Sequence, residues 1–156
     1  MLNNEQVGDT LKKLAGTLRD GEKGFSESAE KVETASLKSL FTELSVQRGQ
    51  LAMDLEPLAR QYGETPREGG SVVAALHRGW LNVRAAVAGH DDYGVVAEAE
   101  RGENVAKGNY EEALKDELPA YVRAVIEAQY AKVKAGHDRV TALRSSMEAA
   151  KEAAKH

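Results

Sequence analysis

The feature that most constrains this chain is an apolar residue at every third or fourth position along four long segments. In the first segment, about residues 4–31, this spacing is carried by Val7, Leu11, Leu14, Leu18 and Phe25. Such spacing places the apolar residues on one face of an α-helix. The pattern returns over about residues 34–62, 91–115 and 119–147. Four amphipathic helices in one chain predict a helical bundle.

Composition supports a single all-helical domain. The chain has 156 residues, of which 42% are hydrophobic and 29% charged, and it contains only 3 Pro. One hydrophobic core is usual at this length. We therefore expect one domain over residues 1–147. The tail, residues 148–156, is helix-prone but has little to bury, so we expect it to fray.

The connections predict how the helices are joined. The link after the first segment is short, which predicts an antiparallel hairpin, and the last two segments form a second hairpin in the same way. Between the hairpins, Ser71 can cap a shorter helix that runs to about Val87. Two antiparallel hairpins joined by a long crossover form the ferritin-like arrangement of a four-helix bundle. The predicted fold is therefore all-α and ferritin-like, with a short crossover helix between the second and third long helices.

Polar residues interrupt each apolar stripe near its middle. Glu22 follows Leu18 by one turn in the first segment, and Glu103 holds a similar position in the third. The other two segments contribute Gln47, Arg48, Gln129 and Tyr130. A buried carboxylate is costly unless it is paired, protonated or bound to metal. The partners of the two glutamates should therefore decide what the bundle does.

One interpretation is a buried ion network without a metal. Arg48 can pair with both Glu22 and Glu103 through its forked guanidinium, and Gln129 and Tyr130 can satisfy the remaining lone pairs. This arrangement explains why a cation stands in the layer. The same cation opposes the binding of a divalent metal.

The alternative is a di-metal site for iron or manganese, in an oxidase or a metal-storage protein. Such sites take one carboxylate from each of two helices and Glu-x-x-His from each of the other two. Glu22 and Glu103 match the single carboxylates, and Gln47 and Gln129 are the remaining candidate ligands. The Glu-x-x-His motifs are missing, since Tyr130 stands where a His is expected. In a third interpretation the stripe is displaced by one position and the glutamates are solvated.

Other features exclude whole classes of function. The chain has 0 Cys, which excludes disulfides and thiolate catalysis. Its formal net charge is -4 and it has no basic tract, so nucleic acid is not an expected partner. No apolar run approaches the roughly 20 residues of a membrane span, and no signal segment is evident, so we expect a cytoplasmic protein without a membrane partner. No catalytic residue is assigned, because neither a phosphate loop nor a Ser/His/Asp arrangement is recognisable.

Several stretches of the sequence resemble a known family. They are residues 20–25 (DGEKGF), 40–44 (LFTEL) with Gln47 and Arg48, 70–80 with the marker His77-Arg78-Gly79-Trp80, 100–103 (ERGE) with Tyr110-Glu111, and 137–140 (HDRV). In these residues the chain resembles a bacterial, uncharacterised family of ferritin-like four-helix-bundle proteins of unknown function. The resemblance implies a ferritin-like fold and a bacterial, cytoplasmic origin. It implies no activity, although the wider superfamily includes carboxylate-bridged di-iron proteins.

The leading hypothesis is therefore a non-enzymatic bundle that forms homo-oligomers, has no cofactor and has a stress-related role. The di-metal protein is the second hypothesis, motivated by Glu22 and Glu103. The third is a partner-binding helical module that uses Trp80 on the crossover helix.

Overall fold

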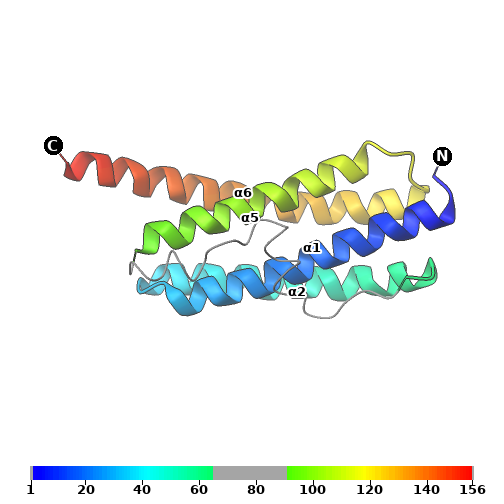
Figure 1. The fold of residues 1–156 in the computed structure, drawn as a ribbon, viewed down its shortest axis with the longest axis horizontal. Coiled ribbons are helices and arrows are strands. Elements are labelled where there is room, and N and C mark those ends of the chain that lie inside the picture. Colours follow the sequence, from blue (N-terminus) through cyan, green and yellow to red (C-terminus); the bar gives the residue numbers. More distant parts are fainter. Residues whose placement is uncertain (1, 65–90, 156) are drawn as a thin grey trace.

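Four α-helices make up the part of the chain that the computed structural model describes, residues 2–64 and 91–155. They are α1 (Asn4–Lys31), α2 (Ala35–Gln61), α5 (Asp92–Leu114) and α6 (Ala120–Ala154), shown in Figure 1. No strand occurs within these two ranges. The prediction of an all-α fold with four long helices is confirmed for the described residues. The predicted crossover helix, including Trp80, lies outside them.

Local signals explain where the helices begin and end. Asn3 caps α1 in a capping box, because its side chain accepts a hydrogen bond from the backbone of Gln6 while the Gln6 side chain accepts one from the backbone of Asn3. Gly63 follows α2 with φ of 83°, a left-handed conformation that glycine adopts without strain. The last helix includes most of the helix-prone tail, and the expectation that residues 148–156 fray stays a prediction. α6 continues to Ala154, in an alanine-rich stretch of high helix propensity, and Lys151 Nζ lies 4.4 Å from the ring centroid of Tyr93.

The helices run in two directions along one long axis. At one end, the backbone N–H of Leu2 donates to Glu117, between α5 and α6, and Lys12 pairs with Glu64 after α2. At the other end, Asp92 accepts hydrogen bonds from the turn between α1 and α2. Helices α1 and α6 therefore run one way and α2 and α5 the other, so that α2 ends and α5 begins at opposite ends of the bundle (Figure 1). Among the described helices, α1 packs against α2 and α5, and α6 packs against α5 and marginally against α2.

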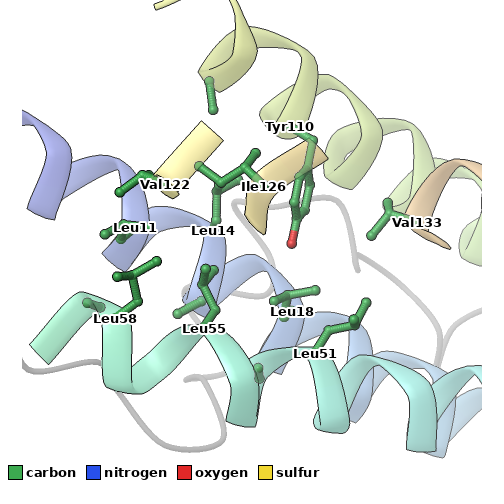
Figure 2. Close-up of a cluster of buried hydrophobic side chains, with 14 of the residues drawn as sticks. Leu11, Leu14, Leu18, Leu51, Leu55, Leu58, Tyr110, Val122, Ile126 and Val133 are labelled. Carbon is green, nitrogen blue, oxygen red and sulfur yellow. The ribbon is translucent and has the colours of Figure 1, made fainter. Parts of the chain in front are cut away.

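Two clusters of buried side chains fill the interior. The large core lies toward the end that holds the start of α1, and Figure 2 shows its leucines meeting Tyr110 and Ile126. It consists of Val7, Leu11, Leu14, Ala15, Leu18, Leu51, Ala52, Leu55, Leu58, Ala59, Ala106, Tyr110, Ala113, Leu118, Val122, Ile126 and Val133. The small core, at the other end, consists of Phe25, Val32, Leu37, Phe41, Leu44, Val95, Val96, Ala99 and Val140. None of the four described helices is long and apolar enough to cross a membrane.

Candidate functional site

A buried ion pair lies between the two cores. Arg48 comes from α2 and Glu103 from α5, and their side chains are 1% and 0% exposed. Arg48 Nη1 donates to Glu103 Oε1 and Arg48 Nη2 donates to Glu103 Oε2, each at 2.6 Å. Two parallel charge-assisted hydrogen bonds of this kind are the strongest pairing that a guanidinium makes with a carboxylate. Since α2 and α5 do not pack directly against each other, this pair joins the two hairpins across the diagonal of the bundle.

Small residues make room for the guanidinium. A Cβ atom on Gly136 of α6 would lie 2.9 Å from Arg48 Nη2 and 3.4 Å from Glu103 Oε2, and one on Gly21 of α1 would lie 3.5 Å from Arg48 Cγ. The guanidinium carbon lies 5.3 Å from the centroid of the Phe25 ring, within the range of a cation–π interaction. All four described helices therefore contribute to one pocket that the Arg48 side chain fills.

One nitrogen of Arg48 lacks a visible partner. Within the described residues, the buried Nε–H of Arg48 donates no hydrogen bond, because the carboxylate engages only the two terminal nitrogens. The two charges of the pair cancel, but the Nε–H donor of Arg48 has no hydrogen-bond acceptor among the described residues. Buried donors of this kind commonly bind a water molecule.

A second polar contact lies within the large core. The hydroxyl of Tyr110 on α5 donates to Gln129 Oε1 at 3.0 Å, and Gln129 Nε2 donates to the backbone carbonyl of Leu51 on α2 at 3.0 Å. Burial raises the pKa of the Tyr110 hydroxyl well above its usual value, and the charge of Arg48 opposes that rise only partly. Tyr110 therefore stays protonated and serves as a hydrogen-bond donor.

Glu22 lies outside this layer, which corrects the expectation that it joins Arg48. Its side chain is 35% exposed, and its Oε1 accepts a hydrogen bond from Arg19 Nη1 at 3.0 Å. Arg19 also binds both carboxylate oxygens of Glu56 on α2, at 2.9 and 2.7 Å. Gly21, and not Glu22, occupies the buried position on α1, so the predicted stripe is displaced by one residue. Because each helical residue turns the side-chain direction by about 100°, that single step moves Glu22 to the edge of the α1–α2 interface.

Two other predicted members are also placed differently. Tyr130 is half-buried, stacks on the ring of Tyr110 and donates to Glu111 Oε2 at 2.6 Å. That hydrogen bond, with a smaller contribution from burial, raises the pKa of Tyr130 to about 12. Gln47 is half-buried on α2, and its Oε1 has no hydrogen-bond partner within the described residues. Neither residue touches the Arg48–Glu103 pair through a hydrogen bond in the described structure.

The donor set does not fit a di-metal centre. Both oxygens of Glu103 are bound by a cation, Gln129 is engaged with Tyr110 and Leu51, and Glu22 belongs to a separate cluster. In the two described ranges no three His, Cys, Asp or Glu side chains gather closely enough to hold a metal ion. His137, on α6, instead lies between Asn104 Oδ1 at 2.7 Å and Asp138 Oδ1 at 3.0 Å. We therefore derive no chemistry through a metal at this position.

The glycines are the site residues that sequence patterning missed. Gly136 interrupts the fourth apolar stripe between Val133 and Val140, and Gly21 interrupts the first between Leu18 and Phe25. A glycine on a stripe of otherwise large residues indicates that a bulky side chain from another helix enters there. Arg48 is the bulky neighbour in both cases.

Comparison with known protein families gives a match over most of the chain. Residues 6–116 match the family model described as Domain of unknown function (DUF2383). This range includes nearly all of α1 and the whole of α2 and α5, and therefore both members of the buried pair, whereas α6 lies beyond it. No curated protein matches the chain.

Proposed function

The chain belongs to the DUF2383 family, a domain of unknown function, and from that premise we propose that it is a non-catalytic, ferritin-like helical bundle held together by its buried Arg48–Glu103 pair. The opposed directions of α1 and α2 and of α5 and α6, with α2 ending far from the start of α5, support the ferritin-like arrangement. The guanidinium stands at the centre of the bundle, where related bundles place metal ligands.

The proposal rests mainly on the hydrogen bonds that Arg48 donates to both carboxylate oxygens of Glu103. Each carboxylate oxygen accepts a short hydrogen bond, and a fixed positive charge lies 2.6 Å away. A divalent ion would have to displace the guanidinium and meet its charge at close range, which is strongly unfavourable away from water. An enzyme of the di-iron kind also needs open coordination positions for its substrate, and the burial of Arg48 and Glu103 supports a non-catalytic centre.

Metal content tests this proposal. Protein expressed with added iron and, separately, added manganese is purified without chelator and measured by elemental analysis. We expect no stoichiometric metal in the wild type and no change in Glu103→Gln. Glu43→Gln serves as the matched control, because Glu43 is an exposed surface carboxylate. Stoichiometric metal that is lost in Glu103→Gln and retained in Glu43→Gln would overturn the proposal.

A second candidate function is self-association through the outer face of α2. Val46 and Met53, two turns apart, are 54% and 64% exposed, and Thr42 and Gln50 on the same face carry no charge. Exposed large apolar residues favour a second apolar surface as partner, and the charged residues Glu43 and Asp54 flank them on α2. We expect a homo-oligomer that dissociates when Val46 and Met53 are both changed to Lys.

Sedimentation velocity tests the second candidate. Tyr121→Lys is the control, because Tyr121 is 70% exposed but belongs to α6. Dissociation in the double variant alone supports an α2 interface. A monomeric wild type at high concentration would exclude it.

A further inference from the structure

The buried pair separates two cores of unequal size. Among the described residues the large core has 17 buried members and the small core has 9. Leu18 and Leu51 belong to the large core, whereas Phe25 and Leu44 belong to the small one. The layer between them is occupied by Arg48 and Glu103, which contribute little apolar surface to either side.

Buried glycines occur at the same level on all four described helices. They are Gly21 on α1, Gly49 on α2, Gly102 on α5 and Gly136 on α6. Glycine is a weak helix former, because it loses more backbone freedom on folding than other residues. Glycine therefore weakens each helix at the level where apolar contact between the two cores is also interrupted, and α1 has further buried glycines at Gly8, Gly16 and Gly24.

We propose that the bundle consists of two cooperative units divided by the Arg48–Glu103 layer, and that the small-core unit opens while the large-core unit stays folded. The smaller buried surface decides which unit opens, since stability scales with apolar burial. Opening of the small-core unit brings water to the ion pair, whose hydration reduces the electrostatic cost of separating the two charges. The bundle thereby has a reversible partly open state that exposes Phe25, Phe41 and Val96.

This model predicts an asymmetry between matched core variants. Val133 and Val140 lie on the same face of α6, on either side of Gly136, and both are 0% exposed. Val133 belongs to the large core and Val140 to the small core. Loss of two methyl groups from Val140 lowers the free energy of both the partial and the global opening, because its contacts are lost in each. Loss from Val133 lowers only the global one.

Native-state hydrogen exchange, measured under conditions where exchange reports the opening equilibrium, tests the asymmetry. The amides of Leu55 and Phe41, both on α2, report on the large and the small core. We expect Val140→Ala to lower protection at both amides by about tenfold. Val133→Ala should lower protection about tenfold at Leu55 and leave Phe41 unchanged. Loss of protection at Phe41 in Val133→Ala, or no loss at Leu55 in Val140→Ala, would overturn the proposal.

A second variant tests whether the ion pair is the divider. In a background with Arg48→Met and Glu103→Leu, an apolar layer should join the two cores into one unit. Val133→Ala should then lower protection equally at Leu55 and Phe41. An unchanged Phe41 amide in that background would show that the pair does not separate the units. Neither measurement depends on metal content, so the outcome is distinct from that of the proposed function.

Discussion

Removing one member of the buried pair should cost far more than removing both. In Arg48→Met the Glu103 carboxylate keeps its 0% exposure but loses both of its hydrogen bonds. Two unit charges about 4 Å apart attract each other by about 4 kcal/mol at the effective dielectric constant that describes most protein sites. Desolvation of the two ions roughly offsets this attraction while the pair is intact. When one ion is removed, the desolvation cost of the other remains without compensation.

The expected loss in the free energy of unfolding is therefore about 3–5 kcal/mol for Arg48→Met or for Glu103→Leu alone. The double variant replaces the pair with side chains of similar volume, so it should range from neutral to about 4 kcal/mol more stable than the wild type. Urea unfolding followed by circular dichroism measures all four proteins. With a slope of about 2 kcal/mol per molar urea, each single variant should lower the midpoint by about 2 M.

The double-mutant cycle supplies the test of the reasoning. A strongly buried pair predicts that the two single losses are far from additive. If each single variant loses less than about 1 kcal/mol, the pair behaves as an exposed salt bridge and the dry central layer is refuted. Additive losses in the double variant would refute the coupling between the two residues.

Three further predictions concern other contacts. Gly136→Ala should lower the free energy of unfolding by about 1–3 kcal/mol, because the added Cβ would displace the guanidinium of Arg48. Gly108→Ala should raise it by about 0.5–1 kcal/mol, because nothing lies within 4 Å of the added Cβ. Thermal or urea unfolding measures both variants. Burial acts to raise the pKa of Asp92, but hydrogen bonds from Thr34 and Glu33 outweigh it and hold the pKa below its usual value. Because the pKa of Asp92 is lower in the folded state, the ionised carboxylate stabilises the fold at pH values above its unfolded-state pKa. This stabilisation is lost as the pH falls through the folded-state pKa. Asp92→Asn should therefore destabilise the bundle by about 1–2 kcal/mol at pH 7 and by much less near pH 2, in unfolding measured across that range. Tyr110→Phe should lower the free energy of unfolding by about 1–2 kcal/mol, because it leaves Gln129 Oε1 buried without a hydrogen-bond donor.

The helices were predictable because their signals are local. Apolar spacing located all four, and the start of α1 follows from Asn3 and the stop after α2 from Gly63, each within one residue. The extension of α6 to Ala154 agrees with the helix-prone tail expected from its alanine-rich sequence, and fraying of this stretch stays a prediction.

The partners in the polar layer were only partly predictable. Arg48 and Glu103 could be selected because each interrupts an apolar stripe, between Leu44 and Leu51 for Arg48 and between Ala99 and Ala106 for Glu103. Glu22 could not be separated from Gly21 in the same way, because both interrupt the stripe and periodicity tolerates an error of one position. The position of Tyr130 depends on the rotation of α6 about its axis, which is set by packing against α5 and not by its own sequence.

The chain order of the ion pair has a consequence for protein synthesis. Arg48 belongs to the hairpin that leaves the ribosome first, and Glu103 emerges 55 residues later. Domains form vectorially as they are made, so the nascent first hairpin carries a positive charge on the surface that will become its interior. That charge must remain hydrated until α5 arrives, which discourages the early hairpin from collapsing onto itself or onto a neighbouring nascent chain. The carboxylate supplied by α5 then neutralises the buried charge, and α6 follows to complete both cores.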